Sequence, residues 1–237
     1  EAGGFAIPTA GWLDGAHHNV PLEILGKPKF NPANGGLAAA LPQIDAKPNA
    51  LLSSEEFEFL DLRGVRRLKE GLGDRPAKVI VYLRRQDALI ASTYAQQIKM
   101  GCRLGSFRDY VTSSLYHPRF DLFMILMRWS HVFGREAMSA GVICEETSGD
   151  LLFDDFLVRL GSPRLEAAKP DKLYNPTPSW AEVELLRRLS ILLKPKGRKF
   201  TPEELQRIKA LARKRVRVDA LDLTVRLQLD ASDLARV

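Results

Sequence analysis

Apolar residues along this chain fall into one short run of strand type and several stretches with helical spacing. Residues 79–83 are almost continuously β-branched or apolar, which predicts a strand buried on both faces of a parallel sheet. A second strand-like run covers residues 137–145. Helices are predicted at residues 17–25, 53–68, 86–100, 106–114, 120–133, 151–160 and 201–217. This alternation of strands and helices indicates an α/β fold.

Local signals predict where some of these helices begin and end. Ser53-x-x-Glu56 is a capping-box pattern, and it predicts the start of one helix that continues to Leu68. The apolar positions of that helix are Phe57, Leu60, Val65 and Leu68. Gly101 is expected to stop the helix that follows the first strand. Residues 26–36 and 42–49 are rich in Pro, Gly and Asn and are predicted to be loops.

Arg84 stands at the carboxyl end of the first predicted strand. In open α/β sheets ligands bind at that edge, and a helix starting near Gln86 or Asp87 would add backbone N–H groups and the positive end of its dipole. These features together favour an anion such as phosphate. The alternative is an ion pair between Arg84 and a nearby carboxylate.

The spacing of Arg84 and Ser92 resembles the second cofactor motif of the sulfotransferases that use 3′-phosphoadenosine 5′-phosphosulfate. In that family the arginine and the serine hold the 3′-phosphate of the nucleotide. Gln86 departs from the proline that many members have, so the chain is more similar to the bacterial-type subgroup. Further segments resemble the family in the same order, at residues 51–55, 120–134, 149–161 and 175–189.

This resemblance implies a three-layer, P-loop-NTPase-like parallel sheet flanked by helices, with a largely helical carboxyl-terminal third. It also implies transfer of a sulfuryl group from 3′-phosphoadenosine 5′-phosphosulfate to a hydroxyl or amine, releasing adenosine 3′,5′-bisphosphate. The expected partners are this nucleotide and a hydroxyl-bearing acceptor, a carbohydrate or small molecule.

The family's first motif, a glycine loop followed by lysine and threonine or serine, does not occur in the 237 residues. We therefore expect residues 1–237 to form a single but partial domain that starts after that loop. Two alternatives stay open. The chain could be a nucleotide-binding or scaffolding homologue without catalysis, or another P-loop-like kinase.

Three residues are candidates for the base that takes the acceptor's proton. His17 and His18 stand at a predicted helix start, where the resemblance places a histidine facing the acceptor, and at most one of two neighbouring residues can point at a given site. Their alternative role is capping or simple exposure. Glu55, in the Ser-Ser-Glu segment, is the third candidate, and it also fits as a first-turn acid that stabilises the helix dipole.

The net charge of +6 is concentrated near the carboxyl terminus. Residues 194–217 hold ten Lys or Arg and two Glu, a charge of +8, which predicts a basic helical arm. The arm is either a surface for a polyanion or a solvated helix face, and nucleic acid is the less favoured partner. Within it, Lys196, Gly197 and Arg198 resemble a late loop that covers the 3′-phosphate end of the nucleotide in heparan-type sulfotransferases.

Neither a membrane span nor a metal site is predicted. The chain has no run of 18 apolar residues, and its two cysteines, Cys102 and Cys144, are far apart with no CxxC spacing. A reducing compartment is therefore expected, and we predict a cytoplasmic protein.

Overall fold

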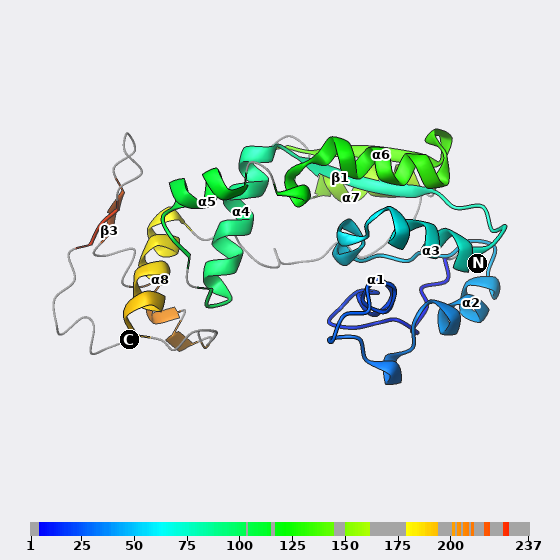
Figure 1. Ribbon diagram of the computed structural model, residues 1–237, viewed down its shortest axis with the longest axis horizontal. Helices are drawn as coiled ribbons and strands as arrows, with labels where there is room; N and C mark the ends of the chain where they lie inside the picture. The colour runs from blue at the N-terminus through cyan, green and yellow to red at the C-terminus, as the bar shows by residue number, and fades with distance from the viewer. Residues whose placement is uncertain are drawn as a thin grey trace. The chain divides into compact units, whose positions relative to one another are not determined.

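Figure 1 shows the computed structural model of the chain. The structure describes residues 5–102, 104–114, 117–144, 150–161, 179–193, 201, 203–204, 206–208, 210, 216–218 and 225–227. The α-helices are α1 (Asn19–Ile24), α2 (Leu37–Asp45), α3 (Leu62–Leu72), α4 (Gln86–Lys99), α5 (Phe107–Ser114), α6 (Leu122–Phe133), α7 (Asp150–Leu160) and α8 (Trp180–Leu193). Short 3-10 helices are η1 (Pro32–Asn34), η2 (Glu55–Phe59), η3 (Pro118–Phe120) and η4 (Arg135–Ala137). The strands are β1 (Val79–Arg84), β2 (Met138–Ile143), β3 (Val216–Val218) and β4 (Val225–Leu227).

The chain divides into two compact units, each made from two separate stretches. The first unit contains Glu1–Arg84 and Asp121–Lys169, and the second contains Arg85–Phe120 and Pro170–Val237. That the two units act as one domain, as expected from the sequence, stays a prediction.

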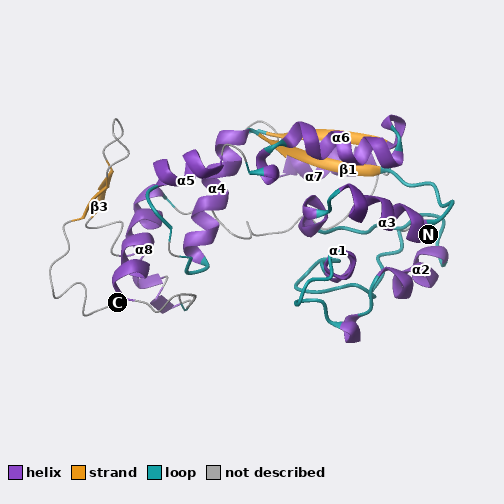
Figure 2. Cartoon of the chain, viewed as in Figure 1, coloured by secondary structure: helices purple, strands orange, loops and turns teal. Residues whose placement is uncertain are grey.

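The first unit is built around a parallel pair of strands, drawn in orange in Figure 2. β1 and β2 are in register from Val79 opposite Met138 to Arg84 opposite Ile143. Val79 packs into the core cluster that includes α6, whereas the ring of Tyr82 lies 6.5 Å from that of Phe156 on α7. Since successive side chains of a strand point to opposite faces, α6 and α7 cover opposite faces of β1. The predicted α/β class is confirmed at this level.

β1 is less enclosed than the sequence predicts. Every one of its residues is half-buried, so the expectation of a strand buried on both faces is too strong. The physical reason is that, among the described residues, β1 pairs with β2 along one edge and with no strand along the other.

The core of the first unit lies between α1, α3 and α6. Val20, Leu60 and Val65 have no exposed surface, and Trp129 is also buried. Val65 and Leu68, three positions apart on α3, face this core, as the predicted helical spacing requires. The ring of Phe57 meets that of Trp129 edge-on, with 6.2 Å between the centroids.

In the second unit, α4 packs against α5 and α8. Tyr94 and Ile98 on α4 are buried against Leu185 and Leu189 on α8, and Ile208 joins them. The rings of Phe107 and Trp180 lie 4.7 Å apart beside this core. β3 and β4 form a separate antiparallel pair.

Three predictions of local structure are wrong. The helix expected from Ser53 to Leu68 is interrupted, because η2 ends at Phe59 and α3 begins anew with Asp61 as its N-cap. The loop expected at 42–49 is helical in its first part, since α2 continues to Asp45 with Pro42 inside it. The basic helix expected to reach residue 217 gives way to a strand at Val216–Val218.

Other boundaries are confirmed. α4 begins at Gln86, and Gly101, with φ of +83°, lies just beyond its end. Thr201 caps the last helical stretch: its hydroxyl accepts a hydrogen bond from Glu204 N–H, and the Glu204 carboxylate accepts one from Thr201 N–H. No helix in the described part of the chain has the length and apolar character needed to span a bilayer.

Candidate functional site

Arg84 is the last residue of β1, at the carboxyl end of the parallel pair, as predicted. Its side chain is half-buried, and among the residues that the structure describes it forms no hydrogen bond and no ion pair. The carboxylate partner considered as the alternative is therefore not found in that part of the chain. A guanidinium presents five N–H donors in a planar fork, which suits a phosphate or a carboxylate of a ligand.

The start of α4, directly after Arg84, has polar groups of its own. Arg85 pairs with Asp87 at 2.6 Å, and hydrogen bonding to Arg85 holds the pKa of the Asp87 carboxyl below its usual value. Gln86 donates from Nε2 to the carbonyl oxygen of Phe120 at 2.8 Å. Gln86, where the sulfotransferase motif has proline, thus ties the first turn of α4 to η3.

Ser92 is half-buried on α4, and its Oγ donates to the carbonyl oxygen of Leu89 at 3.0 Å. The hydroxyl keeps its lone pairs and can rotate, so it can still serve as a ligand. Arg84 belongs to the first unit and Ser92 to the second, and each is placed within its own unit. The paired role expected for them stays a prediction.

His17 is fully buried, and both of its ring nitrogens are occupied. Nδ1 accepts a hydrogen bond from Ser53 N–H at 3.1 Å, so Nε2 is the donor to the Pro8 carbonyl oxygen at 2.8 Å. A general base needs a lone pair that faces the substrate. This geometry argues against a catalytic role for His17 and for a structural one.

His18 lies differently, although it is the next residue. It is half-buried, and its Nδ1 lies 2.7 Å from Ser54 Oγ, which also accepts a hydrogen bond from Glu56 N–H. A hydroxyl within hydrogen-bond reach of an imidazole is an arrangement in which a proton can be taken up. Glu55, beside Ser54, is exposed at the start of η2. The structure thus brings His18 close to the Ser-Ser-Glu segment and separates its role from that of His17.

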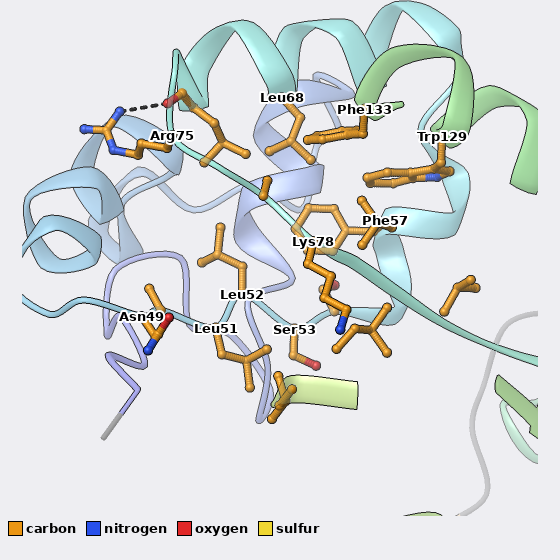
Figure 3. Close-up of a pocket in the computed structure, with 18 of the residues that line it drawn as sticks. Asn49, Leu51, Leu52, Ser53, Phe57, Leu68, Arg75, Lys78, Trp129 and Phe133 are labelled. Atoms are coloured by element: carbon orange, nitrogen blue, oxygen red, sulfur yellow. Dashed lines mark hydrogen bonds between the residues drawn. The ribbon is translucent and has the colours of Figure 1, made fainter. Parts of the chain in front are cut away.

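A cavity of about 840 Å³ lies in the first unit between β1 and the stretch at 47–55 (Figure 3). Lys78 and Ser53 add polar groups to its lining, while Phe57, Trp129 and Phe133 form an apolar wall. Phe156 and Leu160 of α7 also line it. The cavity therefore lies at the edge of β1 and contacts helices from both faces of the strand.

One side chain of the cavity lining, Tyr82, belongs to a network that the sequence did not single out. Its hydroxyl donates to Asp155 at 2.7 Å, and Arg159 pairs with the same carboxylate at 2.6 Å. Partial burial, together with this hydrogen bond, raises the pKa of Tyr82 to about 12. Arg159 also donates to Ser139 Oγ and the Ala140 carbonyl oxygen, which joins α7 to β2.

The available sequence signal for this network is weak. Asp155 and Arg159 stand four apart on a predicted helix, a spacing that usually indicates a solvent-facing pair. Lys78, which precedes β1 and donates to the Arg159 carbonyl oxygen, carries no motif at all. Lys196, Gly197 and Arg198 lie outside the described residues. No cluster of three or more His, Cys, Asp or Glu side chains suited to a metal ion occurs in the described part.

Comparison with known proteins gives one weak relationship. No protein-family model matches the chain, and no solved structure matches it. A protein of Archaeoglobus fulgidus, described as uncharacterized, is 27% identical over 142 residues, which are 59% of this chain and 38% of that protein. The chain thus spans well under two thirds of the length of this relative.

Proposed function

We propose that this chain is the nucleotide-binding part of a sulfotransferase that uses 3′-phosphoadenosine 5′-phosphosulfate. The observation that carries the proposal is the half-buried side chain of Arg84 at the carboxyl end of a parallel strand. Its guanidinium has no hydrogen-bond or ion-pair partner in the described part of the chain. Its proposed ligand is the 3′-phosphate, with the Ser92 hydroxyl as a second contact.

The chemistry of this ligand fits the side chains. A phosphate monoester carries close to two negative charges near neutral pH and three oxygens that accept hydrogen bonds. Arginine offers it a bidentate, charge-assisted contact, which is stronger than a contact between neutral groups. The neighbouring Arg85 does not compete for this role, because Asp87 already holds its guanidinium.

In the proposed reaction an acceptor hydroxyl attacks the sulfur atom and the bond from sulfur to the bridging phosphate oxygen breaks. The sulfuryl group then belongs to the acceptor, which is a carbohydrate or small molecule. His18 is the proposed base, because its ring is tied to Ser54 at one nitrogen and half-exposed, whereas His17 has both nitrogens engaged. Adenosine 3′,5′-bisphosphate leaves with the electron pair of the broken bond.

A second candidate is a homologue that binds the nucleotide but transfers nothing. The sequence feature that favours it is the lack of a glycine loop followed by lysine and serine or threonine within residues 1–237. Both candidates require that the 3′-phosphate be recognised, and they differ in turnover alone.

Thermal unfolding with nucleotides tests the shared part of the proposal. Adenosine 3′,5′-bisphosphate at about 100 times its Kd should stabilise the protein by about 2.7 kcal/mol and raise its Tm, and ATP at the same concentration should raise it less. Arg84→Ala should remove this difference. Arg85→Ala is the matched control and should keep it, since Arg85 is exposed and already paired. If Arg84→Ala keeps the full difference, or if ATP stabilises as well as the bisphosphate, the proposed site is wrong.

A further inference from the structure

α3 presents a basic side to solvent, and the loop that follows α1 continues it. Val65 and Leu68 lie on the buried side of α3, whereas three arginines lie on its exposed side. Two exposed lysines stand in the loop after α1. We call these five exposed cations the α3 basic surface: Arg63, Arg66, Arg67, Lys27 and Lys29.

A hydrogen bond joins the two parts of this surface. Arg67 Nη1 donates to the carbonyl oxygen of Ile24, the last residue of α1, at 2.9 Å. Lys27 follows three residues later, and its N–H donates to the Leu22 carbonyl oxygen at 2.9 Å, which turns the chain at the end of α1. Figure 1 shows α1 below α3. The loop that carries both lysines thus begins next to Arg67.

No ion pair neutralises the α3 basic surface in the part of the chain that the structure describes. Its five cations form none there, in contrast to Arg75, Arg85 and Arg159, which each pair with an aspartate. Glu70 is the only acidic residue of α3, and it too forms no ion pair with a described residue. The chain carries +6 and residues 194–217 carry +8, so all other residues together carry −2. The positive charge of this surface is therefore a local concentration within an otherwise slightly acidic part of the chain.

The arrangement of the arginines on α3 costs stability. Arg63 stands in the first turn, where the positive end of the helix dipole disfavours a cation, and beyond the N-cap Asp61 this turn holds no acid. Arg63 is also three and four residues from Arg66 and Arg67, spacings at which like charges repel on a helix. Local conflicts of this kind are expected at functional sites. This one indicates a ligand that carries negative charge.

The spacing of the cations and the residues around them favour one class of polyanion. Residues three or four apart on α3 are separated by a rise of about 4.5–6 Å, which is close to the length of one sugar unit. Duplex DNA presents one charge per about 1.7 Å of its axis, and proteins that bind single strands add aromatic side chains on which the bases stack. None of the exposed residues of α3 or of the stretch 26–29 is aromatic. A polysaccharide with one carboxylate or sulfate on each sugar fits this surface better.

We propose that the α3 basic surface binds a linear acidic polysaccharide, with its arginines on successive carboxylates or sulfates and its lysines continuing the contact. Arginine holds such groups by bidentate, charge-assisted hydrogen bonds, and the release of counterions adds to the affinity. His18 stands at the other end of α1, whose six residues span about 9 Å. That the bound polysaccharide is also the acceptor rests on the proposed function, whereas its binding does not.

Carbodiimide coupling tests the contact residue by residue. The probe is an oligomer of galacturonic acid, which has one carboxylate on each sugar, and the reagent joins these carboxylates to lysine amines that contact them. Mass spectrometry of the digested 237-residue protein should find Lys27 and Lys29 coupled, and Lys47, an exposed lysine of the same unit, coupled less. The methyl ester of the oligomer has the same sugars without their charge. In excess, it should leave the coupling unchanged.

Two double variants compare cations of equal number. Arg63→Gln with Arg66→Gln should reduce coupling at the two loop lysines by at least about tenfold, although neither lysine is changed. Lys47→Gln with Arg135→Gln removes the same charge from exposed positions of the same unit and should leave that coupling unchanged. Without polysaccharide and at low salt, the first pair of substitutions should raise the Tm by roughly 1–4 °C, because it removes the repulsion within α3.

Several outcomes would overturn the proposal. Coupling confined to lysines of residues 194–217 would assign the polysaccharide to that segment, and equal coupling in the two double variants would exclude the α3 arginines. A Tm lowered by Arg63→Gln with Arg66→Gln would show that these cations stabilise the fold. Displacement of the oligomer by single-stranded DNA, or by phosphatidylserine vesicles, at a lower concentration of charge would assign the surface to nucleic acid or to a membrane. The experiment contains no nucleotide, so it and the test of Arg84→Ala can fail separately.

Discussion

At the scale of single residues, Arg84 differs from three other arginines of the chain in its ion pairing. Arg75, Arg85 and Arg159 each pair with an aspartate at 2.6 Å. Arg84 has no such partner among the described residues. The position of Arg84 at the end of a strand could be predicted from the sequence, because the apolar run that predicts the strand is a local feature. That its charge has no partner among the described residues could not be predicted, because this depends on which carboxylates the fold brings near.

The two neighbouring histidines offer a test at the same scale. His17→Ala should lower the free energy of unfolding by about 2–4 kcal/mol, because it leaves Ser53 N–H and the Pro8 carbonyl oxygen without their partner and opens a cavity. His18→Ala, at a half-buried position, should cost less than about 1 kcal/mol. Urea unfolding of the two variants measures both.

An equal loss of stability in the two variants would contradict the division of roles between these histidines. The sequence could not make this division, since the partners of His17 come from Pro8 and from Ser53, which lies 36 positions away.

Gly141 of β2 gives a second residue-scale prediction. A Cβ at this position would lie 2.5 Å from Cε1 of Tyr82, whose ring is held by Asp155. Gly141→Ala should therefore destabilise the protein by about 1–3 kcal/mol through overpacking. In the background of Tyr82→Phe, which frees the ring from Asp155, the cost of Gly141→Ala should fall. Chemical unfolding of wild type, the two single variants and the double variant measures the coupling free energy between the two positions. Additive losses of stability would show that the Tyr82 ring is not what resists a Cβ at position 141.

At the scale of elements, residues 53–72 form two helices, η2 and α3, and each of them begins at its own N-cap. Ser54 Oγ accepts from Glu56 N–H at the start of η2, and Asp61 Oδ1 accepts from Gly64 N–H at the start of α3. The periodic apolar positions continue through the break, so their spacing alone predicts one helix. The break itself depends on tertiary packing, because Leu60 between the two caps is completely buried.

Substitutions at these caps test the boundary. Asp61→Ala should cost about 1 kcal/mol of stability, as the loss of an N-cap does. Asp74→Ala, at an exposed position after α3, is the control and should cost less than about 0.5 kcal/mol. If the helix instead began at Ser53, Ser53→Ala would be the costly change and Asp61→Ala would be harmless.

The sequence pattern does not predict α2, and the reason is different. Pro42 lies inside it, removes one backbone donor and is disfavoured in a helix by about 3 kcal/mol. The helix forms because Leu37 and Ala40 are buried and because the Glu23 carboxylate accepts a hydrogen bond from Leu37 N–H at 2.9 Å. Contacts from outside the segment thus outweigh its local preference, and local preference is what a sequence pattern reports.

α8 carries a pH-dependent contribution to stability. Burial acts to raise the pKa of the Glu184 carboxyl, but hydrogen bonds from Arg187 and Arg188 outweigh it and hold this pKa below its usual value. A carboxyl with a lowered folded-state pKa stabilises the protein fully above its unfolded-state pKa of about 4.3 and loses that contribution as the pH falls through the folded value. Glu184→Gln should therefore be less stable than wild type at pH 7 and approach it below pH 4 in urea unfolding. A difference that stays constant with pH would contradict this account.

At the scale of the whole molecule, the two compact units have separate cores. Leu60 is buried in the first and Leu185 in the second, each with no exposed surface. Leu60→Ala and Leu185→Ala should each lower the free energy of unfolding of the part of the chain that they destabilise by about 2–5 kcal/mol. Hydrogen exchange locates that effect. If the units unfold independently, Leu60→Ala speeds exchange in α3 and β1 alone, and Leu185→Ala speeds it in α4 and α8 alone.

Faster exchange throughout the chain in both variants would instead show one cooperative domain, as the sequence led us to expect. Sequence patterns do not separate these outcomes, because the stretches of the two units alternate along the chain.

The parallel pairing of β1 with β2 has a consequence for synthesis on the ribosome. β1 is complete at Arg84, but β2 begins at Met138, after about 53 further residues, which take roughly 3–10 s to add at ordinary rates of translation. During that interval β1 is an apolar strand with neither edge paired, the type of segment that aggregates. Lys78 directly before β1, Arg84 as its last residue and Arg85 directly after it place positive charge at both ends. Charges that flank an apolar strand disfavour its aggregation. In the folded protein Lys78 instead donates a hydrogen bond to the Arg159 carbonyl oxygen.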